Sequence, residues 1–600
     1  MTEENKTPDN NKAKYFQNVF ALPKQRRMAF VSVCFAFVFS LFFLMPLDLY
    51  LNNFIEFNIS AGHVALPLLT TGIMIFIPVI LVFPLIFRWK ALDIVTLLLC
   101  GALVASYIQV LFLNGEMGLL TGARTGHSTD LSNSTSRLAF FIIIFIPLCV
   151  WKWIEDGKNH KNVKWGTGML CVSVVILGMQ TAGLIAAIPG YDSKFVRGPG
   201  YLSYDKAFQL SSKKNICVFI TDTLDVKYMT ETLEKYPELN EQLDGFKFYK
   251  NNVSTHCFTF PSITQMITGE IFNNRDSVPD YLEKAWAGRN IIDILRENGY
   301  NTTLLLGKLS TFRRFSHLNN RADNLTALKE SDVRIKHPEI VKTTLNISFG
   351  RAAPSFFKDI FFTRFDAGFS NEFFEWPDDV LTPAINNSAD INYYNRLKTT
   401  GLYIQDERNT FTVAHLNCAH DGGYRYNQET DTVEFYKGGD SIRGCFAILN
   451  EYFTQMKKLD VYDNSTIIIV ADHGSRPLRL QEMDLTGEIT STLMIKPENA
   501  RGNLKTDTSS ELSHVNFRSG ILQIAGLPRE DFGLSYFDII DGQLPQTREL
   551  SSGYKFGVIN KNGKYRITGD PNDLRLIGKY EIKGDANDFS NWTFELRIEE

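Results

Sequence analysis

Acidic residues and a histidine follow two apolar segments that are typical of buried strands. Asp222 comes directly after the run ICVFIT, and the pair Asp472-His473 follows STIIIVA. Short apolar runs rich in β-branched residues and bounded by polar residues indicate buried strands. If both strands are parallel, their carboxyl ends meet at one edge of a sheet, where these side chains would lie together. Two carboxylates and one imidazole suit a hard or borderline divalent metal ion.

The segment around Thr259 offers a hydroxyl group at the start of a predicted helix. Pro261 suits the first turn of a helix, which places Thr259 at or just before the helix N-terminus. Two interpretations of this segment stay open. Thr259 is a helix N-cap, which the segment taken alone favours. Alternatively it is a nucleophile, whose alkoxide would be stabilised by the helix dipole and a bound metal ion.

Strand-like and helical patterns alternate from residue 214 onward. Apolar runs such as NTTLLLG and NTFTVAHL are separated by helical patterns such as NIIDILRENG. This alternation predicts an α/β domain with a mainly parallel sheet covered by helices. Ligands of such folds bind beyond the carboxyl ends of the strands, where Asp222 and Asp472-His473 are expected. We interpret His415, inside NTFTVAHL, as an ordinary buried strand histidine, and His514 as structural.

The first third of the chain contains five long stretches without Asp, Glu, Lys or Arg. They lie between Arg27 and Asp48, Glu56 and Arg88, Asp93 and Glu116, Arg137 and Lys152, and Lys164 and Asp192. A helix needs about 20 mainly apolar residues to cross a bilayer, and four stretches meet this length. The fourth is short but can extend through Trp153 and Ile154 if the flanking Arg and Lys reach the interfaces. The alternative is a buried or re-entrant helix, whereas five spans fit the charges of the loops.

Lysine and arginine residues accumulate in alternate loops of this region. Lys24, Arg26 and Arg27 directly precede the first stretch, two such residues lie between the second and third, and four lysines of 152–164 lie between the fourth and fifth. Because positively charged loops stay in the cytoplasm, five spans place the N-terminus inside and the chain after Asp192 outside. The expected organisation is a cytoplasmic tail, five transmembrane helices, a linker, an α/β domain and a β-rich extension, covering residues 1–27, 28–190, 191–213, 214–540 and 541–600.

The overall charge says little about partners. The chain has 62 Lys plus Arg and 66 Asp plus Glu, giving a net charge of −4. This balance excludes a basic nucleic-acid binder as a description of the whole chain, so we expect no nucleic-acid partner. Eight cysteines in 600 residues are too few for a disulfide scaffold.

A stretch near residue 365 is rich in aromatic side chains interspersed with Lys and Arg. These are Phe356, Phe357, Phe361, Phe362, Phe365, Phe373, Phe374 and Trp376. The pattern suits an interfacial amphipathic element at a membrane. The alternative, core packing of an insertion against the outer domain, is favoured because aromatic runs are usually buried.

Five motifs, in order, resemble those of the alkaline phosphatase and sulfatase superfamily. They are NICVFITDTLD with Asp222, TFPSITQMITG with Thr259, GYNTTLLLGK ending at Lys308, HLNCAHDGGY with His420, and YDNSTIIIVADHG with Asp472 and His473. Together with the five apolar stretches, they resemble the membrane-anchored transferases of this superfamily. Lipoteichoic acid synthases and phosphoethanolamine transferases share this plan.

The resemblance implies roles for individual residues. One divalent metal ion, manganese or zinc with magnesium also open, would be held by Asp222, Thr259, Asp472 and His473. Thr259 would be the nucleophile, and His420 would contact the phosphoryl or leaving group. Lys308 would hold a phosphate oxygen. Taken alone, His420 also fits a solvated loop histidine, and Lys308 a solvated lysine at a strand end.

The implied reaction moves a phosphoglycerol or phosphoethanolamine group from a membrane phospholipid to a cell-surface glycan. It proceeds through a phospho-threonine intermediate, in a domain on the extracytoplasmic side of a bacterial inner membrane. Sulfatases carry Cys or Ser where this chain has Thr259, and Arg where it has Ile263. These departures disfavour sulfate-ester hydrolysis. The alternatives are a phosphodiesterase or sulfatase-type hydrolase of the same fold, or an inactive lipid-binding sensor.

Overall fold

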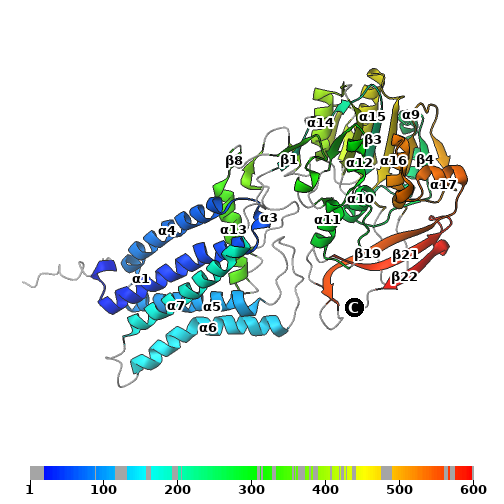
Figure 1. Cartoon of the computed structure of the whole chain (residues 1–600). Coiled ribbons are helices and arrows are strands. Elements are labelled where there is room, and N and C mark those ends of the chain that lie inside the picture. Colours follow the sequence, from blue (N-terminus) through cyan, green and yellow to red (C-terminus); the bar gives the residue numbers. More distant parts are fainter. Residues whose placement is uncertain are drawn as a thin grey trace, which may run out of the picture. The chain divides into compact units, whose positions relative to one another are not determined.

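The computed structural model of the chain divides into two compact units, shown in Figure 1. One comprises residues 1–199 and 329–375, and the other residues 200–328 and 376–600. The structure describes residues 19–597 apart from 88, 115–130, 157–163, 192–199, 205, 274, 307–310, 313–314, 328–330, 332, 355–356, 358–359, 362–371, 377–379, 383–388, 406–407, 418, 421–423, 428, 436–440, 475–489, 560–564 and 568–573.

The first unit, which we call the membrane unit, contains five helical spans long and apolar enough to cross a membrane. They are Lys24–Asn52, Ala61–Ile86, Lys90–Leu113, Arg137–Ile154 and Trp165–Gly190. Each of the five charge-free stretches therefore forms one span, as the sequence predicts. The short fourth stretch belongs to the continuous helix α6 (Leu131–Asp156), and only 6% of its apolar window is buried in the protein. An exposed apolar helix of this length fits a lipid-facing span better than a buried helix.

The first, third and fifth spans begin at the same end of the membrane unit. They consist mainly of α1 (Lys24–Phe39), α5 (Trp89–Ile108) and α7 (Trp165–Ala187). Arg26 donates two hydrogen bonds of 2.6 Å to the Asp93 carboxylate, which joins the starts of α1 and α5. The backbone N–H of Thr167 donates to Gln25 Oε1 at 3.3 Å, which joins the starts of α1 and α7.

A segment that lies in sequence between the two parts of the second unit packs within the membrane unit. It contains α13 (His337–Ala352) and the two-residue strands β8 (Arg334–Ile335) and β9 (Phe374–Glu375). Phe349 meets Phe42 edge to face at 5.2 Å between ring centroids, and Phe373 lies 6.1 Å from Phe57.

These contacts revise the expectation for the aromatic stretch. Phe361 packs on Phe349 at 5.7 Å between ring centroids, and Phe373 is fully buried. Phe361 and Phe373 therefore pack within the membrane unit, whereas the core-packing interpretation assigned them to the outer domain. Trp376 does belong to the second unit, where it packs edge to face on Tyr201 at 6.0 Å. Phe356, Phe362 and Phe365 lie outside the described residues.

A seven-stranded sheet forms the centre of the second unit, which we call the outer unit. Its order is β17-β4-β16-β15-β3-β12-β6. The four strands β15, β3, β12 and β6 are parallel, while β16 runs antiparallel to β15 and β4 antiparallel to β16. In sheet order the bounds are Lys505–Asp507, Lys247–Tyr249, Leu493–Lys496, Ser465–Ala471, Asn215–Thr221, Asn409–Leu416 and Tyr300–Leu305. This mainly parallel α/β fold confirms the predicted class.

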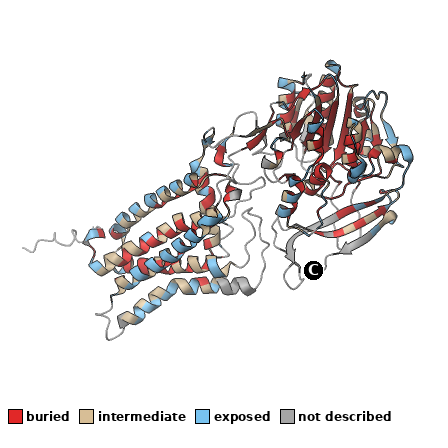
Figure 2. Ribbon diagram, in the orientation of Figure 1, coloured by how far each residue is buried: buried red, intermediate tan, exposed pale blue. Residues whose placement is uncertain are grey.

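Apolar packing on the central strands builds the core of the outer unit. Every residue of β3 and β15 is buried, as their unbroken apolar runs predict. Phe219 of β3 packs edge to face on Tyr452 and Phe453 of α15 (Ser441–Lys458), at 5.0 and 6.0 Å. Figure 2 shows buried strands flanked by helices whose outer sides are exposed.

The last part of the chain forms a four-stranded antiparallel sheet. Its order is β20-β19-β21-β22, with bounds Tyr565–Ile567, Thr547–Ile559, Leu574–Lys583 and Trp592–Arg597. Arg548 is 1% exposed and donates to the backbone oxygens of Asn251 and Gly584. This guanidinium therefore ties the C-terminal sheet to the segment that follows β4.

Candidate metal centre

The strand register brings Asp222 and Asp472 together. Thr221 of β3 pairs directly with Ala471 of β15, so the two aspartates are the next residues on adjacent parallel strands. The Asp472 N–H donates to Thr221 O at 3.3 Å, which continues the pairing by one residue. Both carboxylates are buried, with at most 1% of either residue exposed. The expectation that these strand ends adjoin is therefore met.

His415 completes a cluster that the sequence did not identify. Its Nε2 lies 3.8 Å from Asp222 Oδ2 and 3.9 Å from Asp472 Oδ2. One ligand atom from each of the three residues lies within 4.8 Å of the others, a spacing that can hold a metal ion. His415 is the buried strand histidine that we expected, and its position also makes it a candidate metal ligand. The available signal was its position, next to last in β12, with Ile220 of β3 as its register partner.

His473 presents a ring nitrogen to the same carboxylates. Its Nε2 lies 3.5 Å from Asp472 Oδ2 and 4.0 Å from Asp222 Oδ1. Its Nδ1 lies 2.7 Å from Gly474 O. A carbonyl oxygen only accepts hydrogen bonds, so we assign the proton to Nδ1 and a lone pair to Nε2. That tautomer is the one in which Nε2 can bind a metal.

Buried polar atoms at this centre fit a bound cation. Among the described residues, both Asp222 oxygens, Asp472 Oδ2 and His473 Nε2 are buried without a hydrogen bond. Buried charges are normally paired or coordinated to a metal. Carboxylates together with imidazoles suit a hard or borderline divalent metal ion. The residues therefore fit a divalent ion.

The backbone after Asp222 orients the second carboxylate. Thr223 has a φ of 58°, in the left-handed region that β-branched residues rarely adopt. In this conformation its N–H donates to Asp472 Oδ1 at 3.0 Å, and the N–H of His473 donates to the same atom at 2.8 Å. Two donors therefore hold Oδ1, which leaves Oδ2 directed at His473 and His415.

Thr259 is the first residue of α10 (Thr259–Thr268), and Phe258 occupies the N-cap position. The N-cap interpretation of Thr259 is therefore wrong, while its place at the helix start is as expected. Ser262, one turn further, donates its hydroxyl to Asp472 O and lies 3.2 Å from His514 Nδ1. The first turn of α10 thus contacts the end of β15. Thr259 stays partly exposed, whereas the helix from Pro261 onward is buried.

The two remaining candidate residues, His420 and Lys308, are not part of the cluster described above. His420 lies in the turn after β12 and is partly buried. Its backbone N–H donates to Asn417 O at 3.0 Å. Within the described part of the chain, the acidic and histidine cluster does not include it. Lys308 lies outside the described residues.

Two further histidines, His514 and His256, are buried near the candidate metal centre. Burial, followed by the charge of His473, lowers the pKa of His514 to about 3. Burial, followed by the charge of His514, lowers the pKa of His256 to about 3. His256 Nε2 accepts from the N–H of Phe272 at 3.4 Å, a bond that requires a lone pair on Nε2. Both side chains are therefore neutral supports at neutral pH, and sequence reasoning had not singled out His256.

A mainly parallel α/β sheet therefore carries aspartates and histidines at the ends of its adjacent central strands. The sulfatase family model matches residues 214–527, which is more than half of the chain. The chain belongs to the sulfatase family.

Several solved structures are similar to the chain at low identity. An alkaline phosphatase superfamily protein from Vibrio parahaemolyticus is 14% identical, with a TM-score of 0.34, over 68% of this chain and 86% of that one. A phosphonate monoester hydrolase from Silicibacter pomeroyi is 14% identical, with a TM-score of 0.34, over 64% and 87%. The soluble domain of lipooligosaccharide phosphoethanolamine transferase A from Neisseria meningitidis is 14% identical, with a TM-score of 0.29, over 53% and 92%. No curated protein matches the chain.

Proposed function

We propose that this protein is a membrane-anchored, metal-dependent phosphotransferase. It moves a phosphoglycerol or phosphoethanolamine group from a membrane phospholipid to a cell-surface glycan. The observation that carries the proposal is the union, in one chain of the sulfatase family, of a buried Asp-His-Asp cluster with five apolar helical spans. A soluble substrate would require no such anchor, and one span would already anchor a domain.

The proposed orientation places the outer unit on the extracytoplasmic side of a bacterial cytoplasmic membrane. Arg26 and Lys24 lie at the start of the first span, and the third and fifth spans begin at the same end. Lysine and arginine favour the cytoplasmic face. The opposite end, from which the chain continues to the outer unit, would then face outward, toward a glycan acceptor.

The residues of the outer unit divide the chemistry among them. A divalent ion bound by Asp222, Asp472, His473 and Thr259 would lower the pKa of a coordinated hydroxyl and screen phosphoryl charge. Thr259 Oγ attacks phosphorus, and the bond from phosphorus to the diacylglycerol oxygen breaks. That oxygen takes the proton given up by Thr259, with His420 as the proposed carrier. Lys308 is proposed to hold a phosphate oxygen.

The second step reverses the first with another alcohol. A glycan hydroxyl attacks the phosphorus of phospho-Thr259, and the bond from phosphorus to Thr259 Oγ breaks. The hydroxyl proton returns to Thr259, which regenerates the enzyme. The position of Thr259 at the N-terminus of α10 supports this scheme, because helix N-termini favour anionic groups.

Vesicles containing head-group-labelled phosphatidylglycerol or phosphatidylethanolamine test the proposal with the full-length chain. We expect metal-dependent release of diacylglycerol from one of the two lipids, and its loss in Thr259→Ala. Thr230→Ala is the matched control, because Thr230 is a helical threonine of α8 (Val226–Lys235) that donates to Val226 O. A glycan is then supplied as acceptor. If the label appears only in free glycerol phosphate or phosphoethanolamine and not on the glycan, the protein is a hydrolase. If the purified protein contains no metal and releases no diacylglycerol, the enzyme proposal fails.

A further inference from the structure

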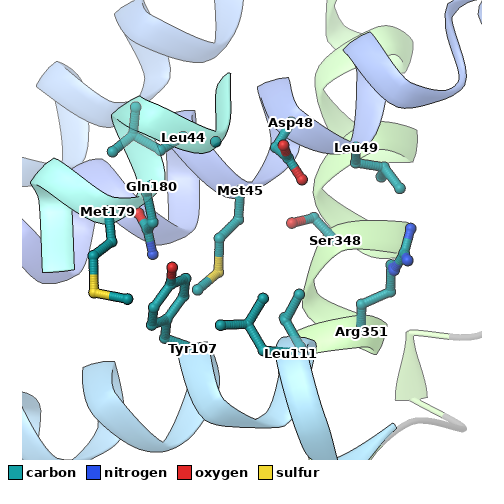
Figure 3. A pocket seen from close by; sticks show the side chains of 12 residues that line it. Leu44, Met45, Asp48, Leu49, Tyr107, Leu111, Met179, Gln180, Ser348 and Arg351 are labelled. Carbon is teal, nitrogen blue, oxygen red and sulfur yellow. The ribbon is translucent and has the colours of Figure 1, made fainter. Parts of the chain in front are cut away.

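A cavity of mixed polar and apolar lining lies inside the membrane unit, among the first, third and fifth spans and α13 (Figure 3). Its volume is about 140 Å³. Five of its lining side chains are polar or charged: Asp48, Tyr107, Gln180, Ser348 and Arg351. The rest are leucine, methionine, valine and glycine. Ionisable residues among transmembrane helices are expensive and commonly mark a functional site.

The two charged side chains of the cavity have opposite signs and come from different helices. Asp48 lies on α2 (Met45–Asn52), and Arg351 lies in the last turn of α13. Among the described residues no ion pair within 4 Å joins them, and the Asp48 carboxylate accepts a hydrogen bond only from Asn52, at 3.2 Å. Arg351 Nε is buried without a hydrogen bond in that same set. Because the Asp48 carboxylate and the Arg351 guanidinium do not form an ion pair within 4 Å, a ligand that carries a positive and a negative group can bind to both.

Gln180 of α7 adds an acceptor to the cavity. It is 8% exposed, and its Nε2 donates to Ser40 Oγ at 2.7 Å. That bond uses one of the two N–H groups of the amide, and Oε1 has no hydrogen bond within the described part of the chain. Figure 3 shows Gln180 facing the cavity beside Tyr107 and Met45. Gln180 Oε1 and the Asp48 carboxylate are both acceptors, as an ammonium group requires.

Two π-helical turns shape the cavity wall. The first, η2 (Ser40–Leu44), contributes Leu44, and the second, η3 (Gln109–Leu113), contributes Val110 and Leu111. Such turns are rare and frequently occur at functional sites. After the second turn, Asn114 Nδ2 donates to Arg351 O at 2.8 Å, which holds the end of α13 against the third span.

The depth of the cavity suits a lipid head group. Asp48 lies near the end of the span Lys24–Asn52, and Leu111 lies near the end of Lys90–Leu113. Both spans begin together at the Arg26–Asp93 pair, so the cavity lies toward the opposite end. At the end of a span, the side chains lie at the depth of lipid head groups rather than of acyl chains.

We propose that this cavity binds the head group of a zwitterionic, amine-bearing phospholipid. The ammonium group binds to the Asp48 carboxylate and Gln180 Oε1, and the phosphate binds to Arg351 with the hydroxyl of Ser348. The apolar lining contacts the glycerol and the first carbons of the acyl chains. This gives the transmembrane helices a lipid-recognition role that is separate from the chemistry at Thr259, and it does not depend on the proposed transfer reaction.

Lipid retention in the absence of turnover tests this site. The full-length chain, carrying Thr259→Ala and kept in chelator, is placed in nanodiscs of equal phosphatidylethanolamine, phosphatidylglycerol and phosphatidylcholine. Native mass spectrometry then counts the lipids that stay bound. We expect phosphatidylethanolamine to exceed phosphatidylcholine about tenfold, the effect of one charge-assisted hydrogen bond that a quaternary amine cannot make. Asp48→Asn removes this preference, and Arg351→Gln lowers retention of all three lipids.

The control variant lies on the same helix. Lys342 of α13 is exposed and pairs with Glu339, so Lys342→Gln should retain lipid as the parent does. Ser348→Ala, a smaller change, should weaken retention without removing the preference for the amine. Equal retention of the three lipids by the parent, or equal losses in Lys342→Gln and Arg351→Gln, would overturn the proposal. Displacement of the lipid by soluble phosphoethanolamine at equal concentration would assign the cavity to a soluble ligand and overturn it as well.

Discussion

Thr223 donates its backbone N–H to Asp472 Oδ1 at 3.0 Å from a left-handed conformation with a φ of 58°. The bond joins the ends of β3 and β15 immediately beside Asp222. A threonine in this region of φ and ψ is strained by about 1–3 kcal/mol, and such strain persists where the surrounding structure requires it. Here it directs the second oxygen of Asp472 toward the candidate metal position.

Replacing Thr223 separates this strain from the hydrogen bond. Thr223→Gly keeps the N–H and relieves the strain, so we expect equal or higher thermal stability, by up to about 1 kcal/mol, and unchanged metal affinity. Thr223→Pro removes the donor and cannot adopt a positive φ, so metal affinity should fall. Thr412→Gly, inside the extended strand β12, is the control and should destabilise. Lower stability of Thr223→Gly than of Thr412→Gly would contradict this account.

Asp222→Asn should change the melting temperature in opposite directions with and without the metal ion. In the metal-free protein, two buried carboxylates face each other, and both Asp222 oxygens have no hydrogen bond among the described residues. Asp222→Asn removes one of these charges, so it should raise the melting temperature of the protein in chelator. With metal present, the same change should lower it, because a ligand is lost. A variant that is less stable than the parent in both conditions would show that the carboxylates do not repel each other.

His415 should contribute to metal affinity. His415→Gln is expected to weaken binding about 10–100-fold, the usual effect of losing a ligand or its direct support. His317→Gln is the control, because His317 lies in the same unit, 3.3 Å from Glu283. Calorimetric titration of the metal-free protein measures the change. Unchanged affinity in His415→Gln would return this residue to the role of an ordinary strand histidine.

Acid should destabilise the outer unit through His256. Its pKa falls from 6.5 to about 3 because the side chain is buried. Between these values the unfolded chain binds a proton that the folded chain does not, so stability is complete above about pH 6.5 and falls as the pH drops. The slope is about 1.4 kcal/mol per pH unit for one histidine. His256→Gln keeps an acceptor for the Phe272 N–H and should reduce this slope by its own share in thermal unfolding with chelator present, while buried His514 keeps an equal share. His337 is exposed, so His337→Gln should leave the slope of stability against pH unchanged.

Arg548 should support the fold without affecting the metal centre. Burial lowers its pKa to about 10, and its donors bind backbone oxygens of Asn251 and Gly584. Arg548→Ala removes these buried charge-assisted hydrogen bonds, although Asn251 O still accepts from the Leu512 N–H and Gly584 O from Asn251 Nδ2, so we expect a loss of about 2 kcal/mol in unfolding free energy. Metal content per folded molecule should not change. Loss of metal in a protein that is still folded would place the C-terminal sheet in the centre itself.

Sequence patterns predicted those features that are local in the chain. The five spans follow from missing charge, and Asp222 and Asp472 follow from apolar runs that end in acidic residues. His415 could not be found in this way, because one histidine in an apolar strand looks like packing until the register with β3 is known. The place of α13 was equally hidden, because nothing near Phe349 identifies Phe42 of the first span as its partner.

The central claim is that Thr259 carries the transferred group. Full-length protein with its metal is mixed with vesicles of head-group-labelled lipid, without a glycan acceptor, and its peptides are analysed by mass spectrometry. The account predicts a phosphodiester adduct on the peptide containing Thr259 that appears together with diacylglycerol and is absent in Thr259→Ala. Undiminished diacylglycerol release by Thr259→Ala, or release without any adduct at Thr259, would contradict it.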